Sequence, residues 1–424
     1  MTSTTPSPAL PSAQATAFPS RSLARNASVL VAGQAIGMVI PLLTIPYLAR
    51  VLGPAAWGPV LAAQAFGNWL GMIFDFGFEL SGTRAVARAR QSPDEMPEVV
   101  HGVQSAKSLL VLATGPLLLI AFVAIPVLRE NRALFAWALG FAVLRGFSPL
   151  WFFQGIERVD TAVGVDTTFR AIAALGVFVF VRGAGDGWRV LALQTVCAAG
   201  AVVVLTIWLA RQVRLRRPAL AAGARTLRGG ASIFACRAWS GVYIQGNALI
   251  LAALASPMTV AFFGGAERIV RAAINMLAPL TQAFLPRISY LHVADPEGAR
   301  RMIRRALGGI GGLGVAMGAA AFVGAPLLVH LLLGPGYAAA IPVLRLLGAL
   351  PALVAINTVL GLYWALPFGY ERDFLVSIVA AGLTNVALAL VLVPRWGAAG
   401  MAASAIAAEL VVFAFLGFLY VRRR

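Results

Sequence analysis

The stretch RVLALQTVCAAGAVVVLTIWLA, residues 189–210, decides the class of fold, because no charged side chain follows its first residue. A helix of about 20 apolar residues is long enough to cross the hydrocarbon core of a membrane. In lipid, every backbone N–H and C=O group must be paired inside a helix or a closed barrel. The run of Ala, Val and Leu lacks the alternation of a barrel strand. It therefore predicts a transmembrane helix.

The composition extends this interpretation to the whole chain. Of its 424 residues, 60% are hydrophobic and 12% are charged, whereas soluble domains average about 45–50% and about 25%. These values exclude an ordinary soluble enzyme, a disordered protein and a fibrous repeat. Apolar segments of sufficient length occur at about 27–48, 58–80, 108–128, 133–154, 162–181, 189–210, 231–253, 259–282, 307–333, 341–364, 374–393 and 397–420. We expect an all-α membrane protein with twelve transmembrane helices.

The excess of positive charge has a topological explanation. The chain carries 34 Lys and Arg against 16 Asp and Glu. If the N-terminus lies inside, 22 of the 34 basic residues fall on the cytoplasmic side, six on the outer side and six within the spans. Cytoplasmic loops of membrane proteins are enriched in Lys and Arg, and such loops attract anionic lipids. We therefore expect both termini in the cytoplasm and no nucleic-acid partner. The basic residues of the second connection are Arg84, Arg88, Arg90 and Lys107.

One basic connection, residues 211–230, divides the expected spans into two sets of six. Residues 21–210 and residues 231–424 are the two expected lobes, and 211–230 is the cytoplasmic linker between them. Residues 1–20 are rich in Ser, Thr, Pro and Ala, which predicts a disordered cytoplasmic tail. A weak similarity between the halves suggests parallel internal repeats. We expect two pseudo-symmetric lobes around a central cavity.

Motifs of enzymes and cofactor-binding proteins are missing from the sequence. No P-loop pattern occurs, so we expect no ATP hydrolysis by this chain. The two cysteines and three histidines are scattered, which argues against a metal site or a disulfide. We expect a transporter without a catalytic residue, cofactor or metal.

Charged residues inside the expected spans are the best candidates for a binding site, because burying them costs free energy. Glu267 and Arg271 are four residues apart in the eighth span, so they share a helix face and can pair. Arg268 lies close to that face, which leaves the cluster with one net positive charge. Arginine forks suit phosphate oxygens. Two interpretations stand, an ion pair that fixes helix packing and a site for a diphosphate.

Other intramembrane polar residues have simpler or separate interpretations. Arg237 in the seventh span has no acidic neighbour in the sequence, and the repeat places Gln34 of the first span opposite it. Arg237 therefore needs a partner, a water-filled cavity or an anionic ligand. Asp166 precedes Arg170 by four residues, which predicts an ion pair. Glu409 stands alone in the twelfth span.

Two carboxylates mark the inner end of the second span. Asp75 and Glu79 are four residues apart, so in a continuous helix they would lie on one face as like charges. We expect them to meet Arg84 or another basic residue of the following loop. A role in ion coupling is a second interpretation.

Four segments resemble one family of membrane proteins. NASVLVAGQAIGMVIPLLTIPYLARVLGPAAWG (26–58) is similar to the first spans of bacterial polysaccharide-export flippases. FDFGFELSGTRAVAR (74–88) resembles the end of their second span, and WFFQGIER (151–158) resembles the end of their fourth. GGAERIVRAAINMLAPLTQAFLPRIS (264–289) resembles their eighth span. The segments occur in the family's order, which makes them more specific together than singly.

The resemblance implies a member of the multidrug/oligosaccharidyl-lipid/polysaccharide exporter superfamily, with twelve helices in two lobes. It implies a flippase of the bacterial inner membrane that moves undecaprenyl-diphosphate-linked oligosaccharide for O-antigen, exopolysaccharide or capsule synthesis, driven by an ion or proton gradient. A polysaccharide polymerase and anionic lipids are the further partners it suggests. The residues to which it assigns contacts with the diphosphate, the sugars or the headgroup are Arg237, Arg268 and Arg271, with Gln34 and Glu267 beside them, and Arg25 and Arg84 at the inner mouth.

Three alternatives remain open at this point. A lipid II flippase shares the fold and the diphosphate chemistry, although such proteins commonly carry two further helices. A multidrug or cation antiporter of the related extrusion family would need a net acidic cavity, whereas this chain has a basic cluster in its spans. A membrane scaffold would gain nothing from charges buried in its spans.

Overall fold

The computed structural model describes the backbone of residues 20–90 and 92–423, and their side chains except for residues 20–38, 93, 231–245, 278–279 and 281–283. Within these ranges the chain is helical and contains no β-strand. This confirms the expected all-α membrane class. The predicted tail lies almost wholly outside the described residues.

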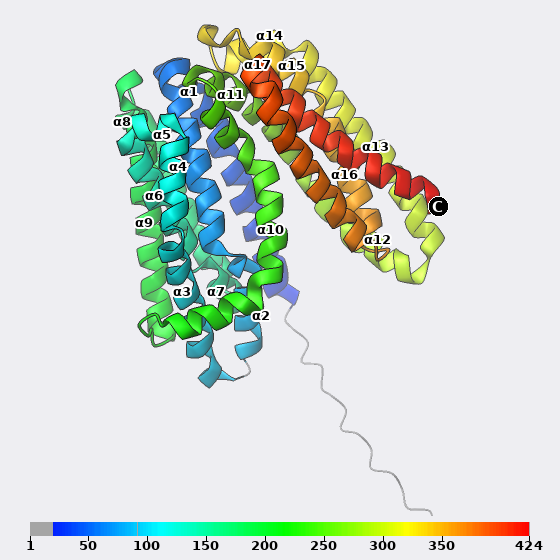
Figure 1. The fold of residues 1–424 in the computed structure, drawn as a ribbon. Coiled ribbons are helices and arrows are strands. Elements are labelled where there is room, and N and C mark those ends of the chain that lie inside the picture. The colour runs from blue at the N-terminus through cyan, green and yellow to red at the C-terminus, as the bar shows by residue number, and fades with distance from the viewer. Residues whose placement is uncertain (1–19, 91, 424) are drawn as a thin grey trace, which may run out of the picture.

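The first group of helices leads from the N-terminus to the connection near residue 213 (blue to green in Figure 1). Its elements are α1 (Ser20–Asp75), α2 (Phe78–Ala89), η1 (Pro93–Glu95), α3 (Met96–Ala113), α4 (Gly115–Ala124), α5 (Pro126–Glu130), α6 (Arg132–Phe147), α7 (Leu150–Gly155), α8 (Val159–Phe180), η2 (Ala184–Asp186) and α9 (Gly187–Gln212). Helix α1 is the centre of this group, since it packs against α6, α8 and α9.

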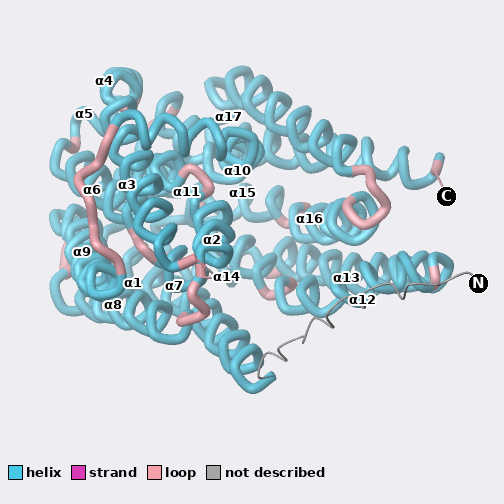
Figure 2. The backbone as a smooth tube through the Cα atoms, turned by 90° about the horizontal axis from the view of Figure 1, so that it is seen from below, coloured by secondary structure: helices cyan, strands magenta, loops and turns pink. Residues whose placement is uncertain are grey.

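A second group contains the C-terminal helices, and two helices join the groups (Figure 1). The joining helices are α10 (Leu220–Leu254), which packs on α3, α1 and α17, and α11 (Pro257–Asn275), which packs on α1 and on α15–α17. The second group comprises α12 (Ala278–Ala294), α13 (Pro296–Val323), α14 (Ala325–Leu332), η3 (Pro335–Tyr337), α15 (Ala340–Leu347), α16 (Leu350–Thr358), η4 (Val359–Ala365) and α17 (Glu371–Arg422). Figure 2 shows the two groups side by side from below.

The predicted linker 211–230 is partly helical. Its second part forms the first turns of α10, and the backbone N–H of Ala219 donates to the hydroxyl of Ser105 in α3 at 3.0 Å. This end of α10 is therefore anchored to the first group.

Two long helices contain a break at a glycine. Gly53 in α1 has φ 69° and ψ 170°, and Gly397 in α17 has φ 53° and ψ −124°. Only glycine adopts such positive φ values without strain. Each break falls at the boundary between two of the spans expected from the sequence.

Seven helices in the described residues are long and apolar enough to cross a membrane, or eight if the pair α3 and α4, bent by 41°, counts as one span. Two of the seven include the glycine breaks of α1 and α17. The chain is thus a multi-pass membrane protein, although this count does not reproduce the expected twelve.

The two groups meet at one end of the molecule, at the top of Figure 1. There the buried phenol of Tyr337 in η3 donates to the carbonyl of Ala49 at 3.1 Å. The guanidinium of Arg50 donates to the carbonyl of Leu331 in α14. The rings of Trp57 and Tyr337 pack edge to face, with centroids 5.9 Å apart. Toward the bottom of Figure 1 the groups diverge.

At this closed end, α1 and α11 touch through their backbones. A Cβ atom on Gly58 would overlap the carbonyl oxygen of Pro257 and lie 2.6 Å from its carbonyl carbon. The hydrogen of glycine is the only side chain that permits this approach. The contact therefore requires glycine at position 58.

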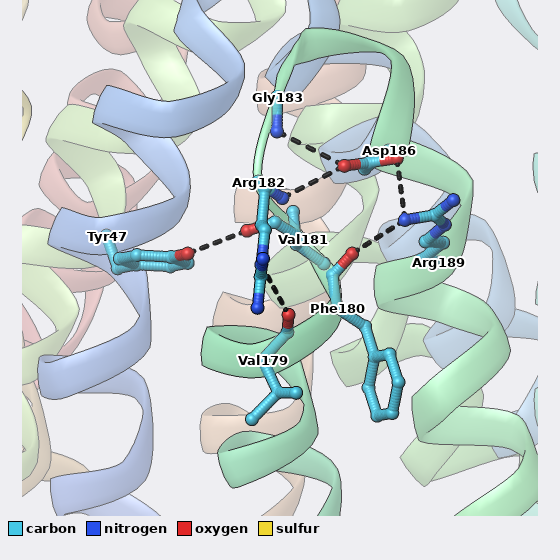
Figure 3. A network of polar contacts seen from close by, with 8 residues as sticks. All are labelled: Tyr47, Val179, Phe180, Val181, Arg182, Gly183, Asp186 and Arg189. Atoms are coloured by element: carbon cyan, nitrogen blue, oxygen red, sulfur yellow. Dashed lines mark hydrogen bonds and ion pairs between the residues drawn. The ribbon is translucent and has the colours of Figure 1, made fainter.

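A polar network holds the turn between α8 and α9 near the same end (Figure 3). The carboxylate of Asp186 accepts hydrogen bonds from the backbone N–H groups of Arg182 and Gly183, at 2.9 Å and 3.2 Å, and pairs with Arg189 at 3.0 Å. Tyr47 of α1 donates to the carbonyl of Val181 at 2.7 Å. The turn is thereby fastened to α1.

Candidate functional site

A small pocket of about 60 Å³ lies beside α11, between α10 and the helices of the second group. Most of its lining is apolar. Its polar lining residues are Glu267 and Arg271 of α11, Asn247 of α10 and Glu409 of α17. Two of the charged residues singled out in the eighth span thus face one pocket.

The predicted ion pair between Glu267 and Arg271 is confirmed. The carboxylate Oε1 of Glu267 accepts from Nη2 of Arg271 at 2.7 Å and from Nε at 3.1 Å. The side chain of Glu267 is 15% exposed and that of Arg271 is 42% exposed. Two hydrogen bonds from one guanidinium to one carboxylate oxygen fix the orientation of the arginine side chain. The pair can therefore present an oriented cation to the pocket.

Arg268 lies on another side of α11 and is not in this pocket. Its Nη2 donates to Oε1 of Gln64 in α1 at 2.7 Å, and its guanidinium lies 5.6 Å from the ring centroid of Trp57. Gln64 in turn donates to the side-chain oxygen of Gln194 in α9 at 3.2 Å. Successive helical residues point about 100° apart, so the expected three-residue cluster is divided between two helix interfaces.

We predict that Gln64→Leu destabilises the protein through Arg268. The variant removes the acceptor of a partly buried guanidinium, which costs about 1–3 kcal/mol. A thermal melt of the purified protein in detergent should show a midpoint several degrees lower. Gln64→Glu keeps an acceptor and should melt near the wild type, whereas equal loss in both variants would contradict this role of Gln64.

Polar residues of α10 and α16 each bind a polar residue of α17. Nδ2 of Asn357 in α16 donates to Oε2 of Glu409 at 2.7 Å, and Nδ2 of Asn385 donates to Oδ1 of Asn247 at 2.7 Å. The expectation that Glu409 stands alone is therefore wrong. Nothing in the sequence paired it with Asn357, because the two residues are far apart in the chain and meet only through packing of α16 on α17.

Three of the predicted site residues lie outside the side chains that the structure describes. Arg237 is on α10, and Arg25 and Gln34 are on α1 before its first described side chain. Their roles stay predictions.

Asp75 and Glu79 are on different helices. Asp75 ends α1 and Glu79 lies in the first turn of α2, and between them Phe76 and Gly77 have positive φ values of 50° and 76°. The expectation of one continuous helix face is therefore wrong. Asp75 is partly buried and Glu79 is exposed, and the exposed Arg84 follows one turn later.

No group of three or more His, Cys, Asp or Glu side chains able to hold a metal ion occurs among the described residues. The described site instead combines one ion pair with the carboxylate of Glu409 and with amide groups, which suits binding of polar groups.

A family model described as "Polysaccharide biosynthesis protein" matches residues 23–292, which include α11 with its ion pair and most of α12. The chain belongs to this family.

A relative of this chain supports the same assignment over nearly the full length. The protein named "Putative O-antigen transporter" from Escherichia coli (strain K12) is 29% identical over 408 residues, which cover 95% of this chain and 97% of the relative. Together with the membrane helices, these findings identify this chain as a membrane transporter and not an enzyme.

Solved structures share the fold of this chain. "Lipid II flippase MurJ, inward closed conformation" superposes with a TM-score of 0.71 at 13% identity, covering 94% of this chain and 87% of that one. An inward-facing multidrug resistance MATE family transporter of the MOP superfamily gives a TM-score of 0.66 at 15% identity, covering 90% and 97%. At these identities the likeness concerns the fold alone.

Proposed function

We propose that this protein is a flippase that moves undecaprenyl-diphosphate-linked oligosaccharide repeat units across the bacterial inner membrane for O-antigen or related polysaccharide synthesis. Membership of the polysaccharide biosynthesis family is the observation that carries the proposal. The oriented Arg271 in the pocket supports it, because a guanidinium fork matches phosphate oxygens.

The proposed architecture has twelve transmembrane helices in two pseudo-symmetric lobes around a central cavity, with both termini in the cytoplasm. The glycine breaks in α1 and α17 support this count, because each divides a helix of more than 50 residues that is too long for one span. The bias of 22 basic residues to one side supports the orientation.

We further propose transport by alternating access, driven by an ion gradient. The closed end formed by the contacts of Tyr337 and Arg50 across the two groups, together with the divergence of the groups at the other end, supports a state that is closed outward. In this proposal the closed end opens when the lobes rock.

The proposed roles follow from position and charge. Arg271 and Arg237 bind the diphosphate, with Glu267 and Gln34 orienting them. Arg25 and Arg84 capture the headgroup at the inner mouth, and Arg268 contributes through the contact between α1 and α11. A second pocket is basic and supports a contact with anionic lipid headgroups. Its charged residues are Glu297, Arg300, Arg301, Arg304 and Arg423.

Complementation tests the function. Expression in a bacterial strain that lacks its own O-antigen flippase should restore polymeric surface polysaccharide, measured by gel analysis and antibody binding to intact cells. An empty vector is the control. Rescue of cells depleted of their lipid II flippase, without restoration of surface polysaccharide, would contradict the proposal and favour the lipid II alternative. Drug resistance in an efflux-deficient host, without either rescue, would favour an antiporter.

A further inference from the structure

Lys107 is the only lysine in the chain. The other 33 basic residues counted with it are arginines. The two side chains differ in one property that matters inside a membrane protein. Arginine stays protonated in proteins, whereas a buried lysine can exist as a neutral amine. Among the lysine and arginine side chains, the one able to release its proton is therefore at position 107.

The structure places Lys107 in the interior and not in the cytoplasmic connection where the sequence placed it. Its relative exposure is 2%. Nζ is fully buried and has no hydrogen-bond partner among the described residues. It lies 5.9 Å from the ring centroid of Phe78 in α2 and 5.8 Å from that of Trp151 in α7. The expectation failed because α2 and α7 fold over this part of α3, which the local sequence does not show.

The carboxylates of Asp75 and Glu79 are the acidic groups that act electrostatically on the Lys107 amine. They belong to α1 and α2, which both pack on α3. From α6, Arg145 acts on the same two carboxylates and donates to Oδ1 of Asn68 at 2.9 Å. The other described charged residues on elements packed against α3 are exposed and are Arg50, Arg84, Arg88, Asp94, Glu95, Arg132, Arg225 and Arg228. The side chain of Arg237 on α10 is not described.

These three groups form a graded series from interior to surface. Lys107 is fully buried, Asp75 is partly buried and Glu79 is exposed. The helix break at Phe76 and Gly77 separates the two carboxylates and adjoins Phe78 of the aromatic wall. A change in this turn would alter both the distance between the charges and the water access of the amine.

We propose that Lys107, Asp75 and Glu79 form the binding site for the coupling proton. The inference rests on the proposed ion-driven transport, and it names the ion and a residue to which no role was assigned. Phe78 and Trp151 exclude water from the amine in the present state. Among the described residues the buried amine has no hydrogen-bond partner, and a buried ammonium without one is unfavourable, so occupancy by a proton depends on the conformation.

The transfer moves one proton and no other group. When a change of state brings the two groups into contact, the Lys107 ammonium gives a proton to the carboxylate of Asp75, which leaves a neutral amine and a carboxylic acid. Asp75 then passes that proton through water to Glu79 or to bulk water. The reverse sequence reloads the amine when the lobes change state.

The single lysine allows a direct test. Protein labelled with [13Cε]lysine gives one side-chain signal, whose chemical shift reports protonation of Lys107. We expect purified protein in detergent to show a titration with its midpoint at least about one pH unit below that of the same signal in the denatured protein. The double variant Asp75→Asn/Glu79→Gln should move that midpoint toward lower pH by about one unit, because the ammonium loses its negative neighbours. An ordinary lysine titration, or a midpoint unchanged in the double variant, would overturn the site.

Transport of the variants gives the second readout. Lys107→Arg keeps the charge but cannot release the proton, and Lys107→Met removes it. Both should lower surface polysaccharide at least about tenfold in the complementation assay at equal membrane levels. Arg88→Lys, an exposed conservative change on α2, is the matched control and should leave export unchanged. Normal export by Lys107→Arg would overturn a role of proton release.

The two readouts separate this inference from the proposed function. Titration requires no substrate, so the expected titration without complementation by the wild type would retain the proton site and overturn the flippase assignment. Complementation by the wild type together with an ordinary lysine titration would retain the flippase assignment and overturn the proton site.

Discussion

Gly58→Ala is expected to abolish export while the protein still reaches the membrane. The new Cβ would overlap the backbone of Pro257, so α1 and α11 could not reach the closed arrangement. Overpacking costs about 1–3 kcal/mol, which shifts a two-state equilibrium by about 5- to 150-fold. Because alternating access requires both states, a protein held open at this end should not complete the cycle.

The population shift can be measured with an impermeant maleimide. In a background without Cys197 and Cys236, a cysteine at Ala261, fully buried one turn from Pro257, should react in Gly58→Ala and stay protected with Gly58 present. Gly164→Ala is the matched control, because a Cβ there meets no atom within 4 Å. Export and protection that remain at wild-type levels in Gly58→Ala would show that closure of this contact is dispensable.

Arg271→Gln should reduce export at least about tenfold, whereas Glu267→Gln should have a smaller effect. A charge-assisted hydrogen bond to an anionic ligand contributes about 1.5–3 kcal/mol, and only the first variant removes the guanidinium. Surface polysaccharide per cell, divided by the amount of transporter in the membrane, is the measurement. Arg170→Gln is the control, since its pair with Asp166 on α8 at 2.7 Å has the same four-residue spacing outside the pocket.

The double variant Glu267→Gln/Arg271→Gln distinguishes the two interpretations of the pair. If Arg271 binds the diphosphate, the double variant should be as inactive as Arg271→Gln. If the pair only fixes helix packing, the double variant should recover export, because neither charge is left unpaired. Recovery would therefore remove Arg271 from the proposed binding site.

Contacts along one helix were predictable, and contacts between helices were not. The pairs Glu267–Arg271 and Asp166–Arg170 follow from four-residue spacing and are both present. Arg268 finds its acceptor in Gln64, 204 residues away, and Glu409 is bound by Asn357. Sequence spacing does not give the rotation of α11 against α1 or of α16 against α17, on which these contacts depend.

The sequence by itself determined that the chain is an all-helical membrane protein, because long apolar segments in lipid must pair their backbone groups internally. It also determined the local ion pairs, because helical geometry sets neighbours four residues apart. Only the tertiary structure decided that Gly58 must touch Pro257 and that the single lysine is buried beside Phe78 and Trp151. These positions depend on how distant helices pack, since burial is a property of neighbouring surfaces and not of the residue itself.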